Sequence, residues 1–285
     1  MKRLWENARQ VPPVGFVADV VELYFVHRVS RSAAELAYFL LLTFFPILIC
    51  ISAFVSKLNL EMSALLEEAS YVLPQEVLAI FQDYLHYIDT HQSDAMLVAG
   101  VFMSALFASA AVRGLMNIMH EIYGRATFQG LRQLIASLIF AVLLLITIYL
   151  SITVVVTGNW FFHMLSQLLR LENLVAQVST WQWCKYLLLT ALVFLFILLL
   201  YRFATPLDKP RPPVIPGSLV AAVALTAASM VFSYFMENST KYSLVYGSLT
   251  SMIILLVWLY LCGNVLIVGS LINYVIYQRK RRKSV

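Results

Sequence analysis

The feature that most constrains this chain is a succession of long apolar stretches, between Ala34 and Tyr277, separated by shorter polar gaps. The stretch from Leu36 to Ser56 carries no charged residue and reaches the roughly 20 residues needed to cross the hydrocarbon core of a bilayer. Only 12% of the 285 residues are charged, whereas a soluble domain has about 25%. These observations exclude a water-soluble protein and predict a polytopic membrane protein.

The pattern predicts a single all-α membrane domain, 1–285, that contains a bundle of six transmembrane helices. We expect the spans at residues 34–56, 95–112, 134–157, 186–203, 217–236 and 249–277. Residues 14–30 are amphipathic and are predicted to form a helix that lies in the membrane interface. The acidic segment 57–94 is predicted to form amphipathic helices on the outer face, and residues 278–285 are a basic tail.

The basic residues lie almost entirely in every second gap. In the predicted arrangement, 16 of the 20 lysines and arginines fall before span one, between spans two and three, at the end of span four or in the gap after it, or after span six. Because cytoplasmic loops are enriched in Lys and Arg, this partition predicts that both termini are cytoplasmic and that the protein lies in the inner or plasma membrane. The rule also accounts for the net charge of +5, so we expect no nucleic-acid partner.

Two spans carry local packing signals. Pro46 lies inside the first span and is predicted to bend it, because its ring clashes with the Leu42 carbonyl, which Thr43 or a neighbouring helix could then satisfy. In the second span Gly100, Ser104 and Ala108 recur every four residues. Such a stripe of small residues predicts the close approach of another helix.

Four strings are similar to those of one known family. They are AELAYFLLLTFFPIL (34–48), RGLMNIMHEIYGR (113–125), PGSLVAA (216–222) and YSLVYGSLTSMIILLVWLYLCGNVLIVGSLIN (242–273). Together they resemble the YihY, or virulence factor BrkB, family, whose members have been labelled ribonuclease BN. The resemblance implies a multi-pass inner membrane protein with six spans. Where the family commonly reads G-A-E-L-N, residues 269–273 read G-S-L-I-N, so no carboxylate is available there to carry a proton.

Ten positions in or beside the spans are candidates for a polar pathway or a lipid contact, because polar groups inside a membrane are often functional. They are Glu35, Tyr38, Pro46, Arg113, Asn117, Tyr242, Tyr246, Gly247, Asn264 and Asn273. Each also has a structural interpretation: a carboxylate at the interface, an arginine that extends to the surface, or a tyrosine of the aromatic belt. A functional Arg113 would contact a lipid phosphate, for which a guanidinium is suited. Gly247, after two tyrosines, permits a turn that could act as a gate.

Asn264 and Asn273 are nine residues apart, which places them about 180° from each other around a helix. They cannot share one face. We therefore expect one of them to join helices and the other to line a polar path.

No motif in the sequence indicates catalysis. The five histidines are dispersed, the three cysteines are isolated, and no triad, Walker or Rossmann pattern occurs. We therefore expect no enzyme, no metal and no cofactor. The preferred interpretation is a protein that moves, or helps to move, an amphiphilic or lipid-like substrate across the bilayer, with membrane lipids as partners. The alternatives are a non-enzymatic scaffold for envelope assembly and, less favoured, a ribonuclease.

Overall fold

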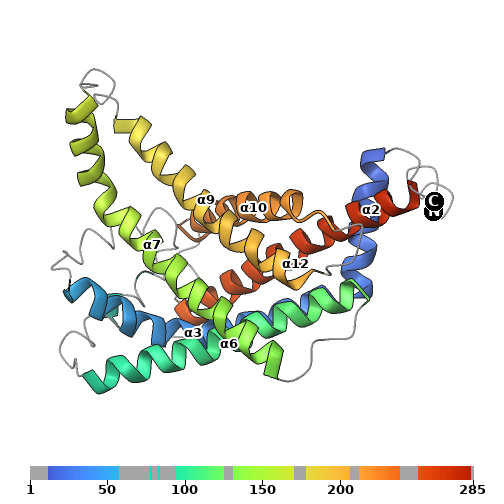
Figure 1. The fold of residues 1–285 in the computed structure, drawn as a ribbon, viewed down its shortest axis with the longest axis horizontal. Helices are drawn as coiled ribbons and strands as arrows, with labels where there is room; N and C mark the ends of the chain where they lie inside the picture. Colours follow the sequence, from blue (N-terminus) through green and yellow to red (C-terminus); the bar gives the residue numbers. More distant parts are fainter. Residues whose placement is uncertain are drawn as a thin grey trace.

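The computed structural model describes residues 12–57, 78, 82–83, 94–124, 131–169, 178–205, 212–237 and 250–283. Within these ranges the chain forms seven helices and no strand (Figure 1). The helices are α2 (Pro12–Val26), α3 (Val29–Lys57), α6 (Asp94–Ile122), α7 (Leu131–Leu169), α9 (Val178–Ala204), α10 (Ile215–Glu237) and α12 (Thr250–Lys283). All except α2 contain a stretch long and apolar enough to cross a membrane. For this part of the chain, the predicted all-α fold with six candidate spans is confirmed.

The candidate spans begin and end near the predicted residues, but two of the helices continue further. The spans cover Val29–Cys50, Val98–Ile122, Gln133–Ser151, Leu187–Ala204, Ile215–Phe232 and Met252–Arg281. Helix α6 continues through Arg113 because the residues that follow bury an apolar face. The helix is followed by Gly124, whose φ of 64° is the left-handed conformation typical of a helix C-cap. Helix α7 continues to Leu169, beyond the expected end at residue 157. Apart from Lys57, Leu78, Gln82, Asp83 and Asp94, the predicted outer helices of residues 57–94 lie outside the described residues.

The six long helices form a closed ring of neighbours. Going round the ring, α3 packs against α6, α6 against α7, α7 against α9, α9 against α10, α10 against α12, and α12 against α3. Helices that follow one another along the chain are therefore neighbours, and α12 closes the ring on the first span. This order places α6 between α3 and α7, the arrangement that matters for the candidate site.

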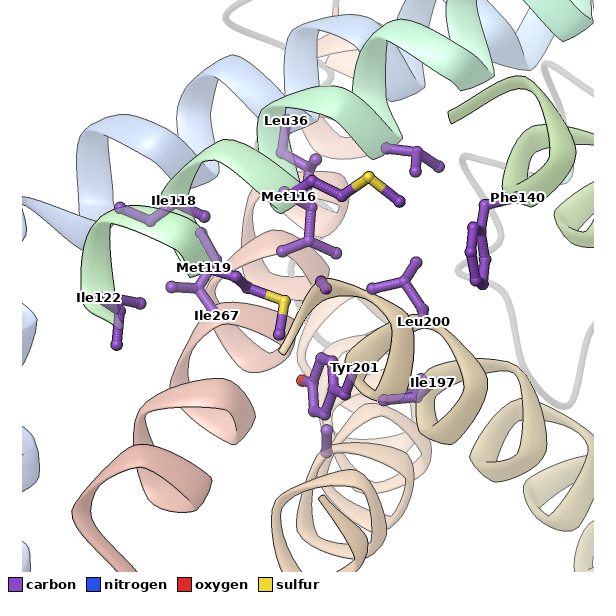
Figure 2. Packing of buried hydrophobic residues seen from close by; sticks show 14 of the residues in the cluster. Leu36, Met116, Ile118, Met119, Ile122, Phe140, Ile197, Leu200, Tyr201 and Ile267 are labelled. Carbon is purple, nitrogen blue, oxygen red and sulfur yellow. The ribbon is translucent and has the colours of Figure 1, made fainter. Parts of the chain in front are cut away.

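The main apolar core lies at one end of the bundle. There the start of α3, the end of α6, the start of α7 and the end of α9 meet the start of α10 and the end of α12. Figure 2 shows this packing, with Met116 and Met119 of α6 facing Leu200 and Tyr201 of α9. The buried residues of α7 all fall within 136–141 and those of α9 within 197–205, among side chains that the structure describes. Among the side chains that the structure describes, the buried part of these two helices thus lies at one end of the bundle. In Figure 1 both helices extend away from α3 and α6 toward the upper left.

Helix α2 crosses this same end of the bundle at a steep angle to α12 (Figure 1). The sequence predicted one helix over residues 14–30, but the helix ends at Val26, and a turn at His27 and Arg28 separates it from α3. Arg28 has a φ of 48°, which few non-glycine residues adopt. Arg279 of α12 donates to Asp19 of α2 at 2.7 Å. This ion pair places the two ends of the described chain at the same end of the bundle.

The stripe of small residues on α6 packs against α3, as predicted. A Cβ at Gly100 would lie 3.0 Å from Cγ2 of Ile49 and 3.4 Å from the carbonyl oxygen of Pro46. Ser104 and Ala108 are buried, and Ser104 Oγ lies 4.0 Å from Cys50 Sγ. Pro46 therefore belongs to the packed α3–α6 interface. The Thr43 hydroxyl donates to the Phe39 carbonyl at 2.7 Å and does not serve Leu42.

Candidate functional site

Asn273 joins α12 to the first turn of α10. Its side chain is fully buried, and its Oδ1 accepts a hydrogen bond from the Gly217 backbone N–H at 2.7 Å. Its Nδ2 donates to the Val214 carbonyl at 3.1 Å. Because the first N–H groups of a helix lack partners within that helix, Asn273 caps α10 from a neighbouring helix. With both ends of its amide satisfied by protein, this asparagine has a structural role.

The glycines around Asn273 let the backbones of α10 and α12 come into direct contact. A Cβ at Gly217 would lie 2.1 Å from the Gly269 carbonyl oxygen, and a Cβ at Gly269 would lie 2.7 Å from the Tyr201 hydroxyl oxygen. That hydroxyl donates to the Leu266 carbonyl. Two of the strings that carry the family resemblance thus meet at this crossing, where close packing requires glycine. Sequence reasoning did not single out Gly217 or Tyr201, because their role depends on a contact between distant segments.

Asn264 belongs to a second polar cluster, which joins α2, α3 and α12. Its Oδ1 accepts a hydrogen bond from the Tyr24 hydroxyl at 2.8 Å, and its Nδ2 donates to the Tyr260 carbonyl at 2.8 Å. The hydroxyls of Ser30 and Tyr260 are 2.7 Å apart. Burial raises the pKa of Tyr24, whose phenol is in any case protonated at neutral pH and can donate. Like Asn273, Asn264 holds helices together.

Three of the predicted positions gather on the outer surface of α6. Glu35 of α3 lies against Gly114, since its Oε1 would be 3.7 Å from a Cβ at that glycine. Arg113 and Asn117 follow on the same helix, and Asn117 accepts a hydrogen bond from Gln133 of α7. Gly114, Asn117 and Arg113 fall within an arc of about 100° around α6. Tyr38 lies one turn beyond Glu35 on the exposed face of α3.

We call Glu35, Tyr38, Arg113, Asn117 and Gln133 the polar seam. Glu35, Tyr38 and Asn117 are exposed, and Arg113 and Gln133 are half-buried. All five lie inside candidate spans. With a rise of about 1.5 Å per residue, Arg113 lies about 13 Å from the end of its span at Ile122, and Glu35 lies about 9 Å from the start of its span at Val29. Polar groups of α3 and α6 therefore lie within the long apolar stretches, on the outside of the bundle.

At the end of α6 the seam continues to a further ionisable group. Glu121 follows Asn117 by one turn and is exposed, and its Oε1 lies 3.4 Å from Nδ1 of His27 in the turn between α2 and α3. Arg113, Asn117 and Glu121 are spaced at four-residue steps, so they form one stripe along α6. This stripe leads from the helix end inward.

The side chains of this site are suited to binding a polar or charged group of a ligand. Among the residues that the structure describes, neither Glu35 nor Arg113 forms an ion pair, and no group of three or more potential ligands could hold a metal ion. The seam thus presents a carboxylate, a guanidinium, two amides and a phenol. The other predicted positions, Tyr242, Tyr246 and Gly247, lie outside the described residues.

The six apolar helices define the chain as a multi-pass α-helical membrane protein. Residues 21–285 match the family described as virulence factor BrkB, and the chain belongs to this family, which confirms the resemblance seen in the sequence. The chain is 25% identical to the ribonuclease-like protein YfkH of Bacillus subtilis, over 94% of this chain and 97% of that protein. It is also similar to UPF0761 membrane proteins of Aeromonas salmonicida, at 25% identity over 90% and 87% of the two chains, and of Chromobacterium violaceum, at 24% over 92% and 62%. No solved structure is significantly similar to it.

Proposed function

We propose that this protein moves, or assists in moving, an amphiphilic lipid-like molecule between the two leaflets of its membrane. The observation that carries the proposal is the polar seam, in which ionisable and amide side chains from three adjoining spans are exposed or half-buried on the outside of the bundle. A polar headgroup crosses hydrocarbon at a high free-energy cost because it loses its hydrogen bonds to water. A seam on the outside of the bundle can replace those hydrogen bonds while the acyl chains remain in lipid.

The uneven packing of the bundle is consistent with this role. Beyond the shared core, the described side chains of α7 and α9 include no buried residue. Segments with few buried contacts open at a low cost in free energy. Movement of α7 relative to α6 would widen the surface on which Arg113, Asn117 and Gln133 lie.

The direction of the seam follows from the proposed orientation, with both termini in the cytoplasm. The basic residues of the alternate gaps support it, and the stripe from Glu121 to Arg113 would then begin at the cytoplasmic surface. Single cysteines introduced as Lys280→Cys and Asp83→Cys, with the three native cysteines replaced, test this topology. An impermeant thiol reagent added outside intact cells should label the second but not the first. Labelling of the Lys280→Cys variant alone would show that the protein has the opposite orientation in the membrane.

A reconstitution assay tests the function itself. Purified protein in liposomes should accelerate the exposure of acyl-labelled phospholipids or polyprenyl phosphates to dithionite, an external quencher. Arg113→Gln should slow this exchange, whereas Lys280→Gln, which changes an exposed charge at the end of α12, should leave it unchanged. If no lipid in a broad panel moved faster than in empty vesicles, the proposal would fail, and the scaffold alternative would gain.

A further inference from the structure

The two charges of the polar seam indicate which headgroup it can accept, an inference that rests on the proposed function. Glu35 and Arg113 have opposite charges, and both adjoin Gly114: Glu35 Oε1 would lie 3.7 Å from a Cβ at that glycine, and Arg113 precedes it in the chain. They are not paired with each other, nor with any other residue that the structure describes. Unpaired charges inside a span are costly, so each favours a partner of opposite sign.

We infer that the seam binds the zwitterionic headgroup of an aminophospholipid, with the phosphate at Arg113 and the ammonium at Glu35. A guanidinium donates two parallel hydrogen bonds to a phosphate, and a carboxylate accepts hydrogen bonds from an ammonium. Asn117 adds a donor, because its Oδ1 accepts from Gln133 and its own amide N–H groups remain available. A single headgroup would thus satisfy both charges at once.

The space at Gly114 suits a ligand placed beside Glu35. Apart from Glu35 Oε1 at 3.7 Å, no atom of another element lies within 4 Å of the point where a Cβ would stand. The glycine itself is half-exposed. A headgroup can therefore approach the α6 backbone at Gly114, next to Glu35 and one residue from Arg113.

The balance of charge disfavours the other lipid classes. A net anionic headgroup at Arg113 would also face the carboxylates of Glu35 and Glu121, which lie on the same surface. A purely cationic headgroup would be repelled by Arg113. A headgroup that carries both charges avoids both conflicts.

The experiment compares acyl-labelled phosphatidylethanolamine with acyl-labelled phosphatidylglycerol in proteoliposomes, so that both headgroups stay unmodified. The native protein should move phosphatidylethanolamine faster. Glu35→Gln should reduce that rate by about tenfold, the value of one charge-assisted hydrogen bond. The same variant should raise the phosphatidylglycerol rate, because it removes a carboxylate that an anionic headgroup would face. Glu35→Asp should restore most of the preference. Arg113→Gln should slow both lipids.

The outcomes separate this inference from the proposed function. If both lipids moved equally and Glu35→Gln changed neither rate, the headgroup assignment would be wrong while lipid movement stood. If neither lipid moved, the proposed function would fail, and the site would be judged by binding. Short-chain phosphatidylethanolamine should then raise the melting temperature of the detergent-solubilised native protein more than phosphatidylglycerol does, and Glu35→Gln should abolish the difference. Equal protection by the two lipids, or by water-soluble glycerophosphoethanolamine, would overturn a site for this lipid.

Discussion

The tight crossing of α10 and α12 makes Gly217→Ala the most demanding test of the packing. The added Cβ would stand 2.1 Å from the Gly269 carbonyl oxygen and 2.5 Å from Cγ of Asn273, well inside van der Waals contact. Because one of these neighbours is backbone, the helices must separate. Overpacking of this kind costs about 1 to 3 kcal/mol. Separation also weakens the two Asn273 hydrogen bonds, each worth about 0.5 to 1.5 kcal/mol.

The expected destabilisation is therefore about 2 to 5 kcal/mol, after the small gain of alanine over glycine in a helix. Gly114→Ala is the matched control, since the same change there meets only Glu35 Oε1 at 3.7 Å and should be neutral or slightly stabilising. Unfolding in mixed micelles by titration with dodecyl sulfate, followed by circular dichroism, measures both variants. Equal stability of the two would refute the close approach of α10 and α12.

Two further perturbations follow from the buried polar groups. Asn273→Ala leaves the Gly217 N–H without its acceptor and should lower the free energy of unfolding by about 2 to 4 kcal/mol. Asn264→Ala, in the half-buried cluster, should lower it by less. Equal losses of stability in the same unfolding assay would contradict the capping role of Asn273. Burial, and then the neighbouring Tyr274, raise the pKa of Tyr123 in the folded protein. The resulting stability is fully present below the pKa of about 10 that a tyrosine has in the unfolded chain, and it is lost as the pH rises further. The melting temperature should therefore fall between pH 9 and pH 11, and Tyr123→Phe should lessen the fall; an equal fall in both proteins would refute this assignment.

The spans were predictable because the bilayer fixes their length and excludes charge whatever the tertiary contacts. What the sequence did not reveal was where the helices end. Helix α6 runs on past Arg113 because Leu115, Met116 and Met119 bury one face against the core, which a hydropathy window interrupted by an arginine does not detect. The turn at Arg28 likewise depends on how α2 packs across the bundle, since nothing in the local sequence demands a positive φ.

The candidate site was predictable residue by residue but not as a site. Glu35, Arg113 and Asn117 stood out as polar groups among apolar ones, yet their gathering depends on α6 lying between α3 and α7. Gln133 was missed because it stands at the start of a span, where a polar residue is ordinary. Asn273 was recognised as polar, but its structural role required contact with Gly217, 56 residues earlier in the chain.

The most direct test of the central claim is the rate of phospholipid exchange in proteoliposomes that contain a variant with an apolar seam. Glu35→Leu, Arg113→Leu and Asn117→Leu together remove the polar stripe from the outer surface of α3 and α6 while sparing the buried core. We expect this variant to fold and insert, and lipid exchange to fall to the rate of empty vesicles. A folded variant that moved lipid as fast as the native protein would contradict the claim that the polar seam carries the headgroup.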